Sequence, residues 1–268
     1  MVFFKKSKQN KEGIMNHFIE TSPNRRLVDL LLPEVVNTAI SELIEEHNRA
    51  DLLRAHNLEP RHRILLTGPP GNGKTSLAEV IATELAIPLL IVRYESVITS
   101  LLGETAVRLS QLFKQVKGQR CVLFFDEFDV VGKERGDIHE TGEIKRVVSS
   151  LLLQIDDLPS DIVVVTATNH PELLDRAVWR RFQLRLHLPP PSVALAQEWF
   201  RRLEERMGAK LGHSPATLAQ KLIRLSFSEL EQFGLDVYRR YVLRLPDADL
   251  KNIVEDCLEQ WQKMKQGG

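Results

Sequence analysis

The chain has 268 residues, of which 43% are apolar and 27% are charged, and its 36 Lys and Arg balance 36 Asp and Glu. This length and composition fit one large α/β domain, or a mid-sized domain with a small companion, and exclude a disulfide-stabilised miniprotein and a disordered chain. The balanced charge gives no global attraction to nucleic acid or to an anionic membrane, so we expect no intrinsic nucleic-acid binding.

The cysteines, the apolar runs and the first residues indicate in which cellular compartment the protein is expected. Cys121 and Cys257 lack the spacing of metal ligands and fit a reducing environment. The longest apolar runs fall far short of the roughly 20 residues of a membrane helix. The chain starts with four apolar residues, Met1–Phe4, ahead of its first lysines and has no apolar stretch after them, so it does not resemble a secretory signal. We therefore expect a cytoplasmic protein.

Charge divides the chain into three segments. Residues 1–26 contain six basic and two acidic side chains, residues 27–191 contain 18 and 23, and residues 192–268 contain 12 and 11. The first segment lacks clear periodicity, so we expect a basic N-terminal tail over residues 1–26, solvated and partly mobile. Docking of this tail to an acidic partner is the alternative.

Residues 27–190 have the pattern of an α/β domain. A helical pattern covers residues 35–48, and from residue 61 short β-rich runs alternate with helical segments, as in a parallel sheet with crossover helices. The runs centred on Val122 and Val164 are apolar on both faces, which predicts central strands covered on both sides. The five predicted strands are residues 63–67, 88–93, 120–125, 161–167 and 182–188.

The pattern changes to helices alone after three consecutive prolines at positions 189–191. Apolar residues recur at helical spacing over residues 196–207, 230–241 and 250–261, and we assign their aromatic side chains to core packing. Ser226, with Glu229 three residues later, predicts a capping box at the start of the middle helix. We expect residues 191–268 to form a small helical domain.

A glycine-rich octet follows the first predicted strand and opens a helix. It matches the phosphate-loop pattern G-x-x-x-x-G-K-[ST], in which backbone amides face phosphate oxygens. In this pattern Lys74 reaches the β and γ phosphates of ATP, and Thr75 places its hydroxyl on Mg²⁺. An ordinary Gly-Pro turn is the alternative. The predicted nucleotide-binding residues are Gly68, Pro69, Pro70, Gly71, Asn72, Gly73, Lys74, Thr75 and Ser76, together with Asp126.

Two adjacent carboxylates end the third predicted strand. We expect Asp126, with Thr75, to hold the magnesium ion, and Glu127 to orient and deprotonate the attacking water. A solvated turn is the alternative for this pair. Asp129 is assigned as a loop or capping acid rather than as a third metal ligand.

Asn169 ends the fourth predicted strand, next to the strand that carries Asp126. The carboxyl ends of neighbouring strands are where ligands bind in open α/β sheets, so Asn169 is a candidate site residue. Its alternative role is a helix cap, because Pro171 suits a first helical position.

Together with the run Glu-Leu-Leu-Asp-Arg-Ala-Val-Trp-Arg-Arg-Phe at residues 172–182, these motifs resemble ATPases of the AAA family, within the larger AAA+ group. The arginine pair is most similar to the microtubule-severing branch, and the whole resembles a bacterial stand-alone AAA ATPase. The resemblance implies a P-loop three-layer parallel sheet of strand order 5-1-4-3-2 and a four-helix lid. It also implies that Asn169 senses the γ-phosphate and that Arg180 and Arg181 are catalytic fingers in a neighbour's site.

Two stretches depart from the family pattern. Leu101 stands where the family's first pore loop has an aromatic residue, although it could instead belong to the first turn of the next helix. The second pore segment, near residues 133–143, mixes charges without a clear sign preference. The lid motif at Ser226–Leu230 matches only loosely and contains no arginine. No zinc motif is present.

We therefore expect a cytoplasmic, Mg²⁺-dependent ATPase that forms a homo-oligomeric ring, hexameric by resemblance, and remodels or threads a protein substrate. The alternative is a nucleotide-driven switch or loader in a bacterial defence or plasmid-maintenance complex, for which the resemblance suggests a subtilisin-like protease as a partner. An inactive scaffold is disfavoured, because the phosphate loop, both acids, Asn169 and both arginines are all present.

Overall fold

The computed structural model describes residues 17–93, 102–129 and 149–266. Contacts group the chain into two compact units, of which the second comprises Leu31–Pro33, Pro69–Gly73 and Leu188–Gly268 and the first comprises the rest. In the described residues, no helix has the length and apolar character that a bilayer span requires.

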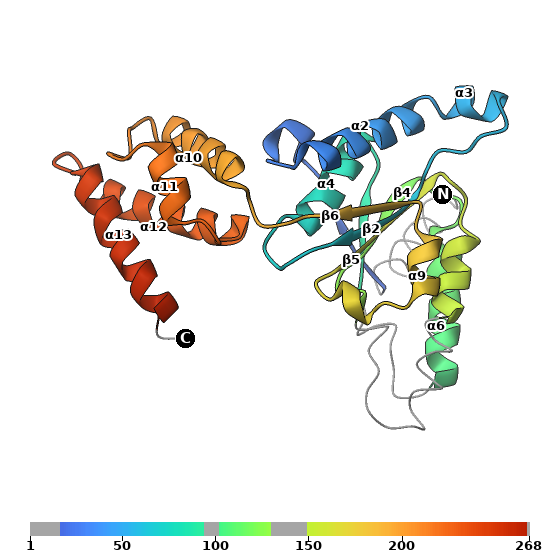
Figure 1. The fold of residues 1–268 in the computed structure, drawn as a ribbon. Helices are drawn as coiled ribbons and strands as arrows, with labels where there is room; N and C mark the ends of the chain where they lie inside the picture. Colours follow the sequence, from blue (N-terminus) through green and yellow to red (C-terminus); the bar gives the residue numbers. More distant parts are fainter. Residues whose placement is uncertain (1–16, 94–101, 130–148, 267–268) are drawn as a thin grey trace, which may run out of the picture. The chain divides into compact units, whose positions relative to one another are not determined.

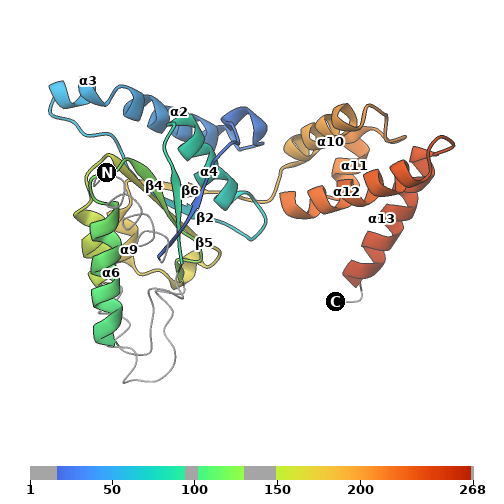
Figure 2. The same cartoon turned by 180° about the vertical axis from the view of Figure 1, so that it is seen from behind.

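The first unit is built around a six-stranded sheet (Figures 1 and 2). In the ribbon, α2 and α4 lie on one side of the sheet, and α6 and α9 lie on the other. Residues 149–156 are also helical. The elements are β1 (Phe18–Thr21), η1 (Leu27–Asp29), α2 (Glu34–Asn48), α3 (Ala50–Ala55), β2 (Arg63–Thr67), α4 (Lys74–Glu84), β3 (Leu89–Val92), α6 (Leu102–Val116), β4 (Cys121–Phe125), β5 (Ile162–Thr168), η2 (Pro171–Leu173), α9 (Arg176–Arg181) and β6 (Leu184–His187).

The sheet order is β1-β3-β4-β5-β2-β6, and β2 to β6 pair in parallel. Numbered by the five predicted strands, this is the order 5-1-4-3-2 that the family resemblance implies, so the expected fold class is confirmed. The two strands predicted to be central, β4 and β5, are buried along their whole length. Apolar side chains on both faces of these strands therefore reflect helices on both faces of the sheet.

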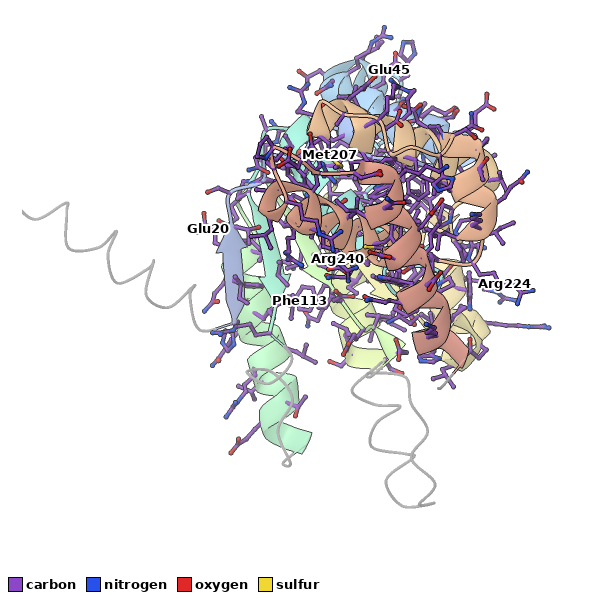
Figure 3. The ribbon with its side chains drawn as sticks, turned by 90° about the vertical axis from the view of Figure 1, so that its left-hand side faces the viewer. Glu20, Glu45, Phe113, Met207, Arg224 and Arg240 are labelled. Carbon is purple, nitrogen blue, oxygen red and sulfur yellow. The ribbon has the colours of Figure 1, made fainter. Side chains whose placement is uncertain are left out.

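The structure differs from the expected N-terminal tail. Phe18–Thr21 form β1, which pairs with β3 in antiparallel fashion, and only Phe18 of this strand is fully buried. Figure 3 labels Glu20 on this outer strand, where its side chain is exposed. The expectation of a tail without regular structure is thus wrong for residues 18–21, because pairing with a distant strand, rather than local periodicity, orders this segment.

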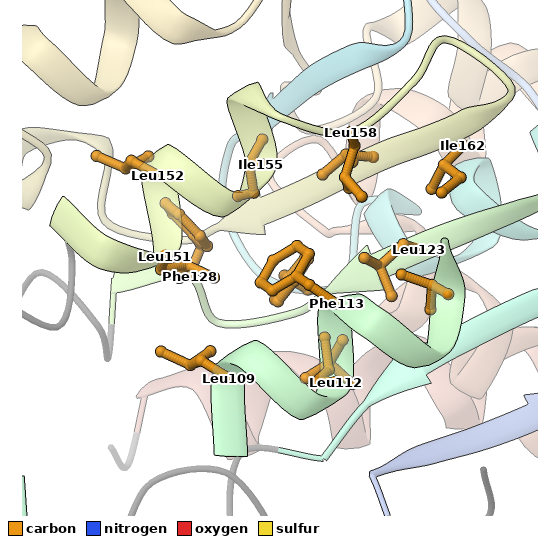
Figure 4. Close-up of a cluster of buried hydrophobic side chains, with 14 of the residues drawn as sticks. Leu109, Leu112, Phe113, Leu123, Phe128, Leu151, Leu152, Ile155, Leu158 and Ile162 are labelled. Atoms are coloured by element: carbon orange, nitrogen blue, oxygen red, sulfur yellow. The ribbon is translucent and has the colours of Figure 1, made fainter. Parts of the chain in front are cut away.

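The main core lies between the sheet and the helices on the α6 side. Leu109, Leu112 and Phe113 of α6 meet Leu123 of β4 and side chains of residues 151–158 (Figure 4). The rings of Phe113 and Phe125 stack with their centroids 6.3 Å apart. Period-two alternation sends Cys121, Leu123 and Phe125 into this core, so the other residues of β4 face α4. This packing fixes the end of β4, where the predicted acids stand.

Up to residue 266, the second unit contains four helices, which pack around the ring of Phe233 and its apolar neighbours. The Ser226 hydroxyl oxygen caps α12 by accepting from the amide of Glu229, and the Glu229 carboxylate accepts from the amide of Ser226. The predicted capping box is therefore confirmed. The apolar periodicity predicts three of these helices, and the short α11 is the fourth helix that the family resemblance implies. The helices are α10 (Val193–Met207), α11 (Pro215–Lys221), α12 (Phe227–Leu243) and α13 (Leu250–Gln266).

Candidate active site

The phosphate loop connects β2 to α4, as the sequence predicts. Gly71 and Gly73 have φ angles of +76° and +88°, a region that glycine adopts without strain. These turns bring the chain from the end of β2 into the first turn of α4, which begins at Lys74. A glycine-rich turn that runs directly into the start of a helix is an arrangement suited to a phosphate group.

The side chain of Lys74 is buried against the loop. Its Nζ donates to the carbonyl oxygen of Gly68 at 2.7 Å and to Oδ1 of Asn169 at 2.6 Å. Burial lowers the pKa of Lys74, while the charges of Asp126 and Asp129 oppose that shift. The contacts bring together two residues that the sequence placed in the site from different motifs.

The side chains of Thr75, in the first turn of α4, and Asp126, directly after β4, are in contact. The Thr75 hydroxyl donates to Oδ2 of Asp126 at 3.1 Å, and Oδ1 of Asp126 accepts from the amide of Glu127 at 2.9 Å. Hydroxyl and carboxylate oxygens are the hard ligands that Mg²⁺ prefers, and here they come from the two predicted motifs to one place. The residues present therefore fit a magnesium ion bound together with a triphosphate.

Glu127 has an unusual backbone conformation. Its φ angle is +48°, which is uncommon outside glycine, and its side chain is exposed. The amide of the following residue, Phe128, donates to the carbonyl oxygen of Ala167 on β5 at 2.8 Å, and this bond holds the turn. Strained residues of this kind persist where the surrounding structure fixes them, often at functional sites.

A buried hydrogen-bond chain holds the end of β5. Oδ1 of Asp129 accepts from the Thr168 hydroxyl at 2.7 Å, and the same hydroxyl oxygen accepts from the amide of His170 at 2.9 Å. Asn169 lies between the two bonded residues, so the chain fixes the backbone that carries it. The cap of η2 is His170, which disfavours the capping role considered for Asn169. Sequence reasoning missed Thr168, whose only signal was a hydroxyl residue ending an apolar strand.

The two predicted finger arginines have different surroundings. Asp175 caps α9 by accepting from the amides of Ala177 and Val178, and this short helix ends with the arginine pair. Arg181 forms an ion pair with Asp156, which also pairs with Arg63 at 2.6 Å. Arg180 is exposed. Among the described residues, no hydrogen bond or ion pair joins either arginine to Thr75, Asp126 or Asn169 of the same chain.

Some expected features lie outside the described residues. These are Leu101 and the second pore segment at residues 133–143, whereas α6 begins at Leu102. Over residues 17–93, 102–129 and 149–266, no cluster of three or more His, Cys, Asp or Glu side chains could hold a metal ion.

The second unit includes part of the phosphate loop. Within this unit, the amide of Ser228 donates to the carbonyl oxygen of Gly71 at 3.0 Å, and the amide of Phe227 donates to Oδ1 of Asn72 at 3.4 Å. A Cβ atom at Gly71 would lie 2.9 Å from the Ser226 hydroxyl oxygen. The loosely matching lid motif is thus the segment of this unit that adjoins Gly71 and Asn72.

The fold and the site together define a phosphate-loop protein that hydrolyses nucleoside triphosphates. The family model described as "ATPase family associated with various cellular activities (AAA)" matches residues 64–190. An uncharacterized AAA family ATPase of Sinorhizobium fredii, y4kL, is 39% identical over 242 residues, which cover 89% of this chain and 72% of that protein. The chain therefore belongs to the AAA family and is an ATPase.

Other relatives are longer than this chain. The Cell division cycle protein 48 homolog of Archaeoglobus fulgidus is 32% identical over 74% of this chain and 28% of its own length. Spastin of Anopheles gambiae is 30% identical over 90% of this chain and 30% of its own length. The crystal structure of the FIGL-1 AAA domain superposes with a TM-score of 0.69 at 23% identity, covering 90% of this chain and 84% of that domain, which shows the shared fold.

Proposed function

We propose that this ATPase hydrolyses ATP at a site shared between two copies of the chain in a ring, by resemblance a hexamer, and uses the energy to remodel a protein. The observation that carries the proposal is the contrast between two adjacent arginines. Arg181 is paired with Asp156 of its own chain, whereas Arg180 is exposed on the last turn of α9. An exposed arginine there is suited to a phosphate group on another molecule.

The first half of the proposed site comes from one chain. Lys74 and the loop amides bind the β and γ phosphates, and Thr75 and Asp126 hold Mg²⁺. When bound, the ion neutralises charge on the phosphate oxygens. Glu127 orients the attacking water and accepts its proton, and Asn169 stands beside Lys74 to contact the γ-phosphate.

The second half comes from the neighbouring chain. Arg180 stabilises the negative charge that grows on the transferred phosphoryl group, an effect that reaches about 10³- to 10⁵-fold in rate where an arginine is supplied in trans. Arg181 stays beside it through its ion pair with Asp156 and orients the end of α9. An isolated copy would then have the nucleotide cradle without this arginine and would hydrolyse ATP slowly.

Complementation between two inactive variants tests the shared site. Lys74→Ala removes the cradle but keeps the finger, and Arg180→Ala does the reverse. If copies mix freely in a ring, a half times a half, or about a quarter, of the boundaries in an equal mixture combine an intact cradle with an intact finger. The mixture should recover ATP turnover that neither variant has alone. Absence of recovery, with mixed rings confirmed by cross-linking, would refute the trans arrangement.

The remodelling activity is tested with a protein client. The wild-type ring should unfold a destabilised, tagged test protein only while ATP is hydrolysed, and the client should stimulate turnover. Leu101→Asp should abolish unfolding but keep basal turnover, because a charge at that position cannot bury against apolar side chains of the client. Unfolding that survives this change would exclude gripping by Leu101.

A further inference from the structure

The segment between β1 and η1 is fastened to α4, the helix that follows the phosphate loop. Arg25 Nη1 donates to the Ser76 hydroxyl oxygen at 2.9 Å, and its Nε lies 3.2 Å from Oε2 of Glu79. The amide of Asn24 adds a bond to Oε1 of Glu79 at 3.4 Å. In Figures 1 and 2 this N-terminal segment runs beside α4. Arg25, a residue of the predicted basic tail, therefore contacts the helix that directly follows the phosphate loop.

The contact with Ser76 places Arg25 at the phosphate end of that helix. Ser76 directly follows Thr75, whose hydroxyl meets Asp126, and it lies in the first turn of α4. In a phosphate loop the amides at this turn face phosphate oxygens. A guanidinium bonded to the Ser76 hydroxyl thus stands at the border of the triphosphate site. The Arg25 side chain is 52% exposed, and its guanidinium carries more N–H donors than the contacts with Ser76 and Glu79 use.

Fastening the segment to α4 does not explain why an arginine stands at position 25. The next residue, Arg26, already binds Glu84 at the other end of α4 through two hydrogen bonds of 2.8 and 3.2 Å, and the amide of Leu27 donates to the same carboxylate at 3.0 Å. The hydrogen bond from Arg26 holds the pKa of Glu84 below its usual range. An additional ion pair as exposed as Arg25 with Glu79 contributes little to stability.

We propose that Arg25 is a nucleotide-contacting residue that binds the phosphate chain of ATP and ADP from within the same chain, alongside the loop amides and Lys74. A planar guanidinium matches the geometry of phosphate oxygens and stays charged at every physiological pH. Its counter-charge, Glu79, lies one turn further along α4, so the guanidinium reaches toward the phosphates from the Ser76 side. The inference depends on ATP binding at the loop, and it is independent of any finger from a neighbouring chain.

Equilibrium binding of a non-hydrolysable ATP analogue and of ADP to the full chain, measured by calorimetry, tests the inference. Arg25→Gln should raise both dissociation constants by about 10-fold, in line with the loss of a hydrogen bond to a charged group. Arg25→Lys should recover part of the affinity, because it keeps the charge without the planar fork. The matched control, Arg26→Gln, removes an adjacent arginine that binds the far end of α4 and should change either constant less than two-fold.

Two further readouts separate phosphate binding from a structural role. With saturating ATP, Arg25→Gln should keep kcat within about three-fold of wild type while KM rises, because the residue binds phosphates without touching the attacking water. The ratio of the dissociation constants of Arg25→Gln and wild type should become smaller between 0.1 and 1 M salt, because salt screens the attraction between the guanidinium and the phosphates. If Arg25→Gln and Arg25→Lys both bind within two-fold of wild type, or Arg26→Gln causes the same loss, Arg25 only fastens the segment and the inference is wrong.

Discussion

Lys74 donates a hydrogen bond to the side-chain oxygen of Asn169 across 2.6 Å, and this bond joins the phosphate loop to the end of β5. The two residues follow neighbouring parallel strands whose last residues, Thr67 and Thr168, are partners in the register. Strand pairing thus delivers both side chains to one point. Under the proposed function, a triphosphate bound by the loop would contact the amide of Asn169 together with the ammonium of Lys74.

Asn169→Ala should therefore lower kcat for ATP by about 100-fold, the usual effect of removing one preorganised polar contact to a reacting group. The dissociation constant of ATP should change only a few-fold, because Lys74 and the loop amides remain. Steady-state kinetics and equilibrium binding measure the two quantities. His170→Ala, which changes an exposed side chain beside it, is the control. A kcat within two-fold of wild type would remove Asn169 from the site.

Glu127→Gln should bind ATP normally and hydrolyse it at least about 100-fold more slowly, because an amide cannot accept the proton of the attacking water. Single-turnover hydrolysis of radiolabelled ATP measures the chemical step directly. Glu172→Gln, which neutralises an exposed acid on η2, should leave turnover unchanged. A normal rate in Glu127→Gln would assign the base to another residue.

The contrast between Arg180 and Arg181 predicts different effects of their substitution on stability and on activity. Arg181→Ala breaks the ion pair with Asp156 and should cost about 1 kcal/mol of unfolding free energy, as for partly exposed pairs. Arg180→Ala, at an exposed position, should leave stability within about 0.5 kcal/mol but remove most turnover. Urea unfolding and ATPase assays at high protein concentration separate these effects. Equal stability losses in both variants would contradict the distinction.

The core between α6 and the sheet predicts a large packing effect. Phe113 is fully buried, so Phe113→Ala should destabilise the protein by about 3–5 kcal/mol through lost apolar burial and a residual cavity. Val107→Ala on the same helix removes a side chain that is 56% exposed and should cost well under 1 kcal/mol. Urea unfolding followed by circular dichroism compares them. A similar midpoint for both would show that the core can close around the missing ring.

Two buried histidines predict a pH dependence of stability. His47 bonds through Nε2 to the carbonyl oxygen of Arg61, and His62 bonds through Nδ1 to that of Pro60. Burial lowers the pKa of both below the ordinary 6.5, although Glu46 and Asp161 oppose the shift at His47. The unfolded chain then binds more protons than the folded one below pH 6.5, so the unfolding free energy should fall as the pH drops through that value.

The double variant His47→Asn, His62→Asn should flatten this slope between pH 7 and pH 5, whereas the exposed His56→Asn should not. Unfolding free energies from urea titrations at a series of pH values provide the measurement. An unchanged slope in the double variant would assign the dependence to other groups.

Most of the sheet and the cis part of the site could be predicted because local patterns determine them. The phosphate-loop motif fixes its own position between a strand and a helix, and β-rich segments that are apolar on both faces marked β4 and β5. Once the parallel order was expected, Asp126 and Asn169 had to end neighbouring strands. The meeting of Lys74 with Asn169 follows from that order.

The remaining features depend on contacts between distant residues. β1 has only one fully buried side chain and is ordered by its partner β3, so no local periodicity revealed it. The pairing of Arg181 with Asp156 joins the end of α9 to residues before β5, and the sequence alone offers many equally acceptable partners. α11 is a seven-residue helix that packing stabilises, although Ser214 and Pro215 were recognisable start signals.

β1 also shields the hydrogen-bonding edge of β3, a strand whose four residues are Leu, Leu, Ile and Val. Left open, that edge would be a template on which other polypeptides, including unfolded ones, could add strands and start aggregates. The outer strands of the sheet are β1 and β6, which expose Glu20 at one edge and Arg185 at the other. Charged side chains at such edges disfavour unwanted strand pairing. A protein proposed to handle unfolded chains is thereby protected from becoming a nucleus for their deposition.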